Sequence, residues 1–217
     1  MHKKKGNGLP INVGWFNMIG SKFGRTLLHG AAEYGFLDRV PRELLTVANL
    51  SIADNVGWTT YHVATAYGNL LQLPESLLTS QSMQLKDTIG ASPLHKAALM
   101  GNLHKVPERL LTLENIMERD NSGQTVIHAA AAGGHFDLVP KGLLTPHTLM
   151  IKSDTGLAPL HLVMVHDCLC YMPLGIKLPE IARGIVGDEW WKKNQTVVEA
   201  NNGLTPETSN AAEVEIF

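Results

Sequence analysis

Five histidines recur at a fixed spacing and are the first residues in the chain that suggest chemistry. They stand 33 residues apart, at His29, His62, His95, His128 and His161. Imidazole is the commonest metal ligand among side chains, so a metal site is the first hypothesis. Histidines on neighbouring packed helices would be roughly 8–10 Å apart, whereas zinc needs each ligand nitrogen about 2 Å from one ion. We therefore expect these histidines to be structural hydrogen-bonding groups and predict no metal site.

Other catalytic or cofactor-binding patterns are missing from the sequence. His166 with Cys168 and Cys170 would supply three metal ligands, but no fourth ligand is spaced to complete the set. The chain has no Gly-x-Ser-x-Gly nucleophile motif, no phosphate loop ending in Gly-Lys and no His-Glu-x-x-His motif. We therefore expect neither an enzyme nor a bound cofactor.

The spacing of the histidines is shared by other residue types, so the chain is built from a repeated unit. Glycine recurs at Gly24, Gly57, Gly90, Gly123 and Gly156, and proline recurs at Pro41, Pro74, Pro107, Pro140 and Pro173. Leucine pairs recur at Leu44-Leu45, Leu77-Leu78, Leu110-Leu111 and Leu143-Leu144. A fixed period in this size range indicates a stacked array in which each unit packs on its neighbours.

The wording of the repeat resembles the ankyrin repeat. The segments Ser92-Pro93-Leu94-His95-Lys96-Ala97 and Ala158-Pro159-Leu160-His161 come closest to that family's Thr-Pro-Leu-His-x-Ala signature. The resemblance covers about residues 22–173 and implies a helical array that binds partner proteins through its turn tips and first-helix face. The chain departs from the family pattern at its repeated prolines, which stand where a continuous second helix is expected.

Local signals predict three helical pieces in each repeat. In the first copy, Thr26 suits an N-cap, a helix is expected at about residues 27–34, and Gly35 suits a left-handed stop. Proline costs about 3 kcal/mol inside a helix, so a second short helix is expected to start at Pro41 and cover about residues 41–45. A final single turn, capped by threonine, is expected to end at Leu50, Met83, Ile116 and Leu149 in the four copies.

These signals predict an all-α fold, an ankyrin-type helical repeat solenoid with four full repeats, a degenerate fifth and terminal caps. The array is expected over residues 24–173, divided as 24–56, 57–89, 90–122, 123–155 and a partial 156–173. Residues 1–23 are interpreted as an N-terminal capping segment, 174–200 as a C-terminal helical cap and 201–217 as a flexible tail. Arrays need atypical ends because each outermost repeat would otherwise expose its apolar face.

Composition excludes several classes of partner. The chain has 217 residues, 44% of them hydrophobic, and a net charge of −2. Lys3-Lys4-Lys5 is its only basic run, so nucleic acid is not expected as the partner. The most apolar stretch, Leu157 to Val165, is too short to span a bilayer, and the first 20 residues do not resemble a secretory signal. We expect a monomer in the cytoplasm with reduced cysteines, although export as an effector remains open.

Apolar residues at positions that the repeat does not require give the candidate binding site. The resemblance places them on the turn tips and the exposed face of the first helix. We call them the apolar strip: Phe23, Tyr34, Val56, Trp58, Tyr67, Ile89, Leu99 and Met100. Exposed apolar patches usually mark binding sites, so the expected function is a non-catalytic scaffold that holds a protein on its concave face. The strip residues might instead pack on neighbouring repeats or on the N-terminal segment. A different class of function is a delivered effector or regulator whose array targets an activity in the caps or in another chain.

Overall fold

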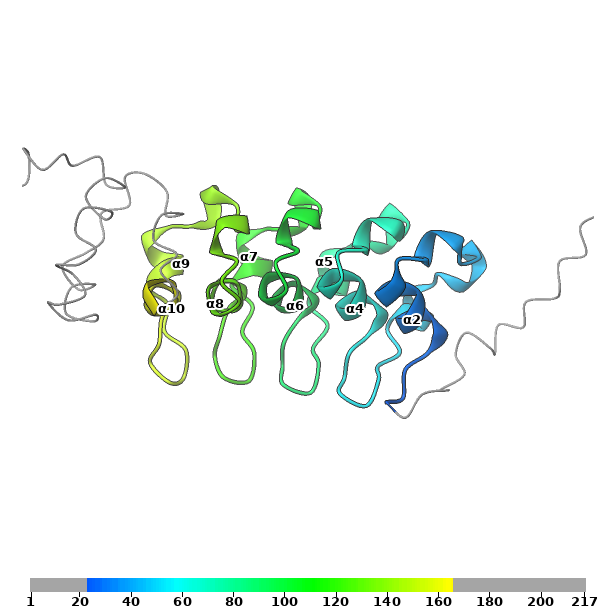
Figure 1. Cartoon of the computed structure of the whole chain (residues 1–217), viewed down its shortest axis with the longest axis horizontal. Helices are drawn as coiled ribbons and strands as arrows, with labels where there is room; N and C mark the ends of the chain where they lie inside the picture. The colour runs from blue at the N-terminus through cyan, green and yellow to red at the C-terminus, as the bar shows by residue number, and fades with distance from the viewer. Residues whose placement is uncertain (1–22, 166–217) are drawn as a thin grey trace, which may run out of the picture.

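The computed structural model describes residues 23–165, and these form one elongated row of helices (Figure 1). The five longer helices are α2 (Leu27–Tyr34), α4 (Thr60–Ala66), α6 (Pro93–Leu99), α8 (Val126–Ala132) and α10 (Pro159–Val165). Each contacts the next, α2 with α4, α4 with α6, α6 with α8 and α8 with α10. Residues 23–165 contain helices and turns but no β-strand, so the all-α solenoid is confirmed.

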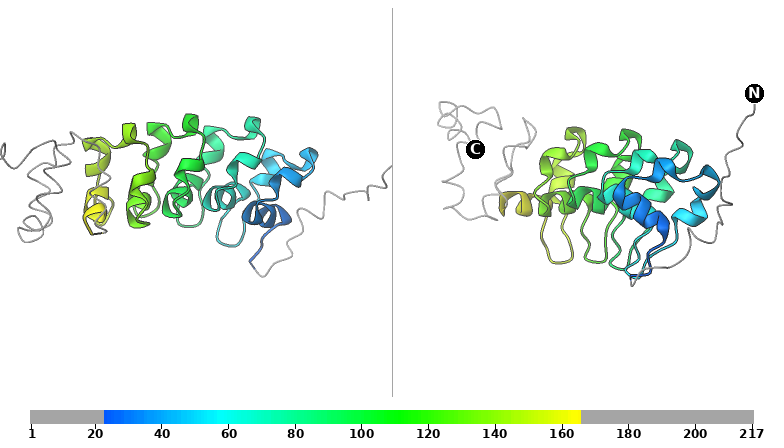
Figure 2. Two further views of the ribbon diagram at one scale, coloured as in Figure 1. Left: turned by 45° about the horizontal axis from the view of Figure 1, so that its top comes forward. Right: turned by 45° about the vertical axis from the view of Figure 1, so that its right-hand side comes forward.

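A loop precedes each longer helix after the first and projects from one side of the row, while the shorter helical pieces lie on the other side (Figures 1 and 2). The short α-helices are α3 (Val47–Leu50), α5 (Ser80–Met83), α7 (Leu113–Ile116) and α9 (Pro146–Met150). Between each longer helix and the next short one lie two 3-10 turns. These are η1 (Leu37–Arg39), η2 (Arg42–Leu44), η3 (Leu70–Gln72), η4 (Glu75–Leu77), η5 (Leu103–Lys105), η6 (Glu108–Leu110), η7 (Phe136–Leu138) and η8 (Lys141–Leu143).

The repeated prolines act differently from the prediction. Pro41 does not start a helix over residues 41–45 but stands between two 3-10 turns of three residues, η1 before it and η2 after it. Its backbone is extended, with φ −54° and ψ 134°, and the same geometry recurs at Pro74, Pro107 and Pro140. Proline disfavours a helical conformation for the residue before it, so the return leg is split into single turns.

The other local predictions for the first copy hold. α2 spans Leu27–Tyr34, Thr26 is its N-cap, and Gly35 follows with φ +74° in the left-handed region. Thr46 caps α3 by accepting a hydrogen bond from the Asn49 backbone N–H. The predicted ends of the single turns are correct at Leu50, Met83 and Ile116, while α9 runs one residue further, to Met150.

The core runs along the axis of the row and is filled by equivalent residues from successive repeats. Three positions in each repeat supply side chains that are at most 1% exposed: Leu28, Tyr61, Leu94, Ile127 and Leu160; Leu37, Leu70, Leu103 and Phe136; and Leu50, Met83, Ile116 and Leu149. Ala64, Ala97 and Ala130 are also fully buried, and their small side chains let neighbouring helices approach closely. Each repeat therefore shelters its apolar surface against the next one.

Several predictions fall outside the described residues. The N-terminal capping segment up to residue 22, the end of the fifth copy, the C-terminal cap at 174–200 and the tail at 201–217 all lie there. The group of His166, Cys168 and Cys170 also lies there.

Candidate functional site

The repeated histidines join each helix to the loop of the next repeat. Nδ1 of His62 accepts a hydrogen bond from the Thr59 backbone N–H at 3.1 Å, and Nε2 lies 3.1 Å from the Ala91 carbonyl oxygen. An amide can only donate and a carbonyl can only accept, so the ring is neutral with its proton on Nε2. His29, His95 and His128 repeat this arrangement with the carbonyls of Trp58, Gln124 and Leu157.

Burial keeps these rings uncharged. It lowers the pKa of His62 and of His95 to about 4, although the hydrogen bond from each ring to a carbonyl opposes this shift. The pKa values of His29 and His128 are lowered for the same reason. His161 accepts a hydrogen bond from the Ala158 backbone N–H at 2.9 Å. Within residues 23–165 no three His, Cys, Asp or Glu side chains are grouped to hold a metal ion. These histidines are structural links between repeats.

A repeated aspartate fixes each loop, and the sequence reasoning missed it. Oδ1 of Asp87 accepts hydrogen bonds from the backbone N–H groups of Ile89 at 3.0 Å and Ala91 at 2.8 Å. Asp54 and Asp120 make the same pair of bonds two and four residues ahead. Their 33-residue spacing was a readable signal, which ends at the equivalent Ser153.

The loop tips are also tied to each other. The carbonyl oxygens of Phe23, Val56, Ile89 and Ser122 accept hydrogen bonds from the backbone N–H groups of Asn55, Thr88, Asn121 and Asp154, at 2.9–3.2 Å. Gly57 has φ +80°, and a Cβ there would lie 2.6 Å from the Thr88 backbone nitrogen, so neighbouring loops approach closely. The backbone that carries the tip side chains is therefore held in place.

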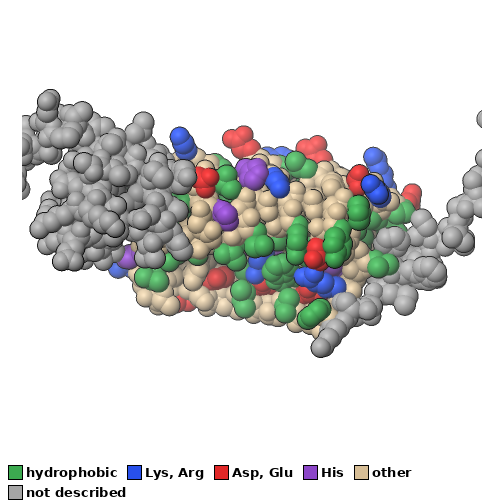
Figure 3. Space-filling view, viewed as in Figure 1, with side chains coloured by type: hydrophobic (Ala, Val, Ile, Leu, Met, Phe, Trp, Pro, Cys, Tyr) green, Lys and Arg blue, Asp and Glu red, His purple; other side chains and the backbone are tan. Residues whose placement is uncertain are grey.

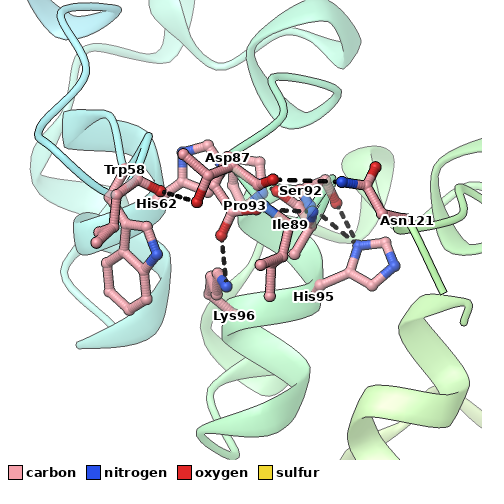
Figure 4. A network of polar contacts seen from close by, with 12 residues as sticks. Trp58, His62, Asp87, Ile89, Ser92, Pro93, His95, Lys96 and Asn121 are labelled. Carbon is pink, nitrogen blue, oxygen red and sulfur yellow. Dashed lines mark hydrogen bonds and ion pairs between the residues drawn. The ribbon is translucent and has the colours of Figure 1, made fainter.

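A buried ion pair lies where the second and third repeats meet (Figure 4). The Lys96 ammonium group is 2.6 Å from an Asp87 carboxylate oxygen, with the two side chains 8% and 2% exposed. The same ammonium lies over the Trp58 ring, 5.0 Å from its centroid. Burial alone would raise the pKa of Asp87, but hydrogen bonds from Lys96 and the Ala91 backbone outweigh it, and the pKa is lowered.

A second polar network orders the first two repeats. Arg25 contacts Glu33 at 2.8 Å and Asp54 at 3.2 Å. The Tyr67 hydroxyl donates a hydrogen bond to the other Glu33 carboxylate oxygen at 3.2 Å. Partial burial and the negative charge of Glu33 raise the pKa of Tyr67. The phenol ring of Tyr67 is thereby oriented by a residue from the preceding repeat.

The structure exposes seven of the eight apolar strip residues. Phe23, Tyr34, Val56, Tyr67, Ile89, Leu99 and Met100 are each between 43% and 71% exposed. Trp58 was predicted to be an exposed tip residue, but it is half-buried and packs against the core, because Lys96 from the next repeat covers its ring. In Figure 3, hydrophobic side chains gather on the lower half of the face, from the α2 end toward the middle, with charged side chains among them.

Comparison with known proteins assigns the repeat. No curated protein matches the chain. Among the described residues, no helix has the length and apolar character needed to cross a bilayer. The family model of ankyrin repeats (3 copies) matches residues 66–144, which contain α6, α8 and the loops, histidines and glycines described above. The number of repeats in the whole chain stays a prediction. Ankyrin repeats generally mediate protein–protein interaction, and the repeat array of this chain is an ankyrin repeat array.

Proposed function

We propose that the chain is a monomeric, non-catalytic scaffold of the cytoplasm that binds a protein partner through the apolar strip. The observation that carries the proposal is the exposure of seven large apolar side chains on one region of the array. A contiguous apolar patch of this kind usually marks an interaction site. Aromatic side chains, of which this region has three exposed, are enriched among the residues that dominate binding energy.

The rigidity of the surrounding backbone supports the same proposal. The side chains of Val56 and Ile89 project from loops whose carbonyls and amides are bonded to neighbouring loops and to Asp54 or Asp87. A surface ordered before binding loses little conformational entropy when a partner docks. The array therefore offers apolar contacts at low entropic cost.

The charges near the strip argue for a protein partner over a nucleic acid. Arg25 is paired with Glu33 and Asp54, and Lys96 is buried against Asp87. Cations that are already neutralised have little to offer to phosphates, which nucleic-acid binding requires. The strip instead supports recognition of an apolar protein surface.

A double substitution with a matched control tests the proposal. Val56→Lys with Leu99→Lys places two charges in the strip, while Ser122→Lys with Ala132→Lys makes the same change at equivalent positions of the fourth repeat. Both Ser122 and Ala132 are exposed. Proteins captured from the native host by the wild-type chain are quantified by mass spectrometry, after equal melting temperatures have been verified. At least one should be retained by the control and reduced about tenfold by the strip variant. Undiminished capture of every protein by the strip variant would refute the proposal.

A further inference from the structure

Six of the strip residues form two rows at equivalent positions of three successive repeats. Phe23, Val56 and Ile89 stand on the loop tips, 33 residues apart, and form the tip row. Tyr34, Tyr67 and Met100 stand at the ends of α2, α4 and α6, also 33 residues apart, and form the helix row. Each repeat thus contributes one apolar residue to each row.

Both rows end at the fourth repeat. The tip row would continue at Ser122 and the helix row at Gly133, and neither residue offers a large apolar side chain. The fold itself continues through α8 with the same loop, histidine and aspartate contacts. The loss of apolar side chains is therefore not a consequence of a change in the repeat, and the paired rows mark a surface three repeats long.

The spacing of the rows restricts the conformation of an occupant that uses both. Packed helices, and hence equivalent residues of neighbouring repeats, are roughly 8–10 Å apart. Seven residues of an α-helix rise about 10.5 Å and complete almost two turns, so every seventh side chain returns to the same face. In an extended chain three residues cover about 10 Å, but alternate side chains point to opposite faces. Every third residue would then face the array only half of the time.

Two parallel rows match the two apolar positions of a heptad pattern. In an amphipathic helix with apolar residues at two positions per heptad, one set forms one edge of the apolar seam and the other set forms the second edge. One set would meet Phe23, Val56 and Ile89, and the other would meet Tyr34, Tyr67 and Met100. The nearby Arg25–Glu33 and Lys96–Asp87 pairs satisfy each other's charge, so an uncharged helix face suits the surface between the rows.

We infer that the partner docks as an amphipathic α-helix lying along the array axis, with apolar residues recurring every seven residues in two sets. Three repeats correspond to two steps of seven residues, so with a turn to spare the docking helix has about 18 residues. This inference rests on the proposed function, because it specifies the partner of the same surface.

Peptide selection on the full chain tests the inference without knowledge of the partner. A phage library of random 18-residue peptides is selected on the wild-type chain and on the Ser122→Lys, Ala132→Lys control. Clones that also bind the Val56→Lys, Leu99→Lys variant are removed. We expect the remaining pool to show apolar residues spaced by three or four and by seven, with proline depleted from the central positions. The best peptide should gain helical circular dichroism on binding and bind at least tenfold more weakly with a central proline.

The outcomes separate this inference from the proposed function. A strip-dependent pool rich in proline or with alternating apolar residues would overturn the helical partner and leave the strip as a binding site. Clones that bind the strip variant as well as they bind the wild type would overturn both. So would a selection that enriches no strip-dependent clone.

Discussion

At the scale of single residues, each buried imidazole replaces what would otherwise be an unpaired backbone group on either side of a repeat junction. Nδ1 satisfies an amide at the start of its own helix, and the proton on Nε2 satisfies a carbonyl of the next loop. Neither group has access to water once the repeats are stacked, and an unsatisfied buried amide or carbonyl costs about 1–3 kcal/mol. A histidine that does both jobs must stay neutral.

His62→Ala should therefore lower the free energy of unfolding by about 2–4 kcal/mol, since it leaves the Thr59 amide and the Ala91 carbonyl without a partner. Urea denaturation measures the change. His104→Ala removes the exposed histidine of η5 and should change stability by less than about 0.5 kcal/mol. Equal effects of the two substitutions would contradict the structural role of His62.

The buried Lys96–Asp87 pair gives a second prediction at this scale. Asp87→Ala removes two loop hydrogen bonds and also leaves the Lys96 charge buried without its partner. Asp120→Ala removes the same two loop bonds in a repeat that has Ala129 where the third has Lys96. Because breaking a buried pair costs about 3–5 kcal/mol, Asp87→Ala should be the more destabilising by about 2 kcal/mol in chemical denaturation.

A third variant isolates the charge. Lys96→Met in the Asp87→Ala background keeps an apolar chain over Trp58 and removes the uncompensated ammonium group. It should bring stability back to the level of Asp120→Ala. If Asp87→Ala and Asp120→Ala were equally destabilising, the lysine would contribute nothing through its charge.

At the scale of elements, the ends of the longer helices depend on backbone conformations that side chains resist. Gly68 has φ +74° after α4, and a Cβ there would lie 2.6 Å from Lys105 Cδ and 2.9 Å from Asn102 Oδ1. The lysine side chain can move aside, so the main cost of a larger residue is the left-handed backbone, about 1–2 kcal/mol. This glycine ends the helix and starts the return leg.

Gly68→Val should accordingly lower the melting temperature by several degrees. Gly142→Val is the matched control, because Gly142 lies within η8 and a Cβ there would meet nothing within 4 Å. Thermal unfolding followed by circular dichroism compares the two. A control variant that melts as low as Gly68→Val would show that the left-handed conformation is not the cause.

The success of sequence reasoning also depended on the range of the interactions involved. Thr26, His29 and Gly35 act within a few residues of their own helix, so their types and spacing predicted where α2 begins and ends. The half-burial of Trp58 depends on Lys96, 38 positions later, and no local pattern indicates it. The 3-10 turns around Pro41 were missed because the proline was taken as the start of a helix, although its extended backbone also ends the turn before it.

At the scale of the whole molecule, stability is distributed along one axis. Each repeat contacts its neighbours, and no residue of the described array touches a distant repeat through a metal cluster. Arrays of this kind gain stability from nearest-neighbour interfaces. We therefore expect EDTA to leave the melting temperature unchanged, as measured by calorimetry with and without the chelator. A fall of several degrees would mean that a metal contributes to the fold.

Acid should weaken all junctions together, because four of them depend on neutral histidines. For His62 and His95 the pKa is about 4 in the folded chain and about 6.5 when unfolded. The unfolded chain therefore binds more protons between these values, so the stability present above pH 6.5 is lost as pH falls toward 4. At pH 5 each of the two should account for a loss of about 2 kcal/mol.

Urea denaturation at pH 7, 6 and 5 tests this linkage in a range where most carboxylates remain ionised. The midpoint should fall steadily across the range for the wild-type chain. His62→Ala should start lower at pH 7 but fall by less between pH 7 and 5, because one of the titrating rings is gone, whereas His104→Ala should fall as the wild type does. A midpoint that stays constant from pH 7 to 5 would show that these rings do not titrate differently in the folded and unfolded chain, and the neutral junctions inferred from their hydrogen bonds would be wrong.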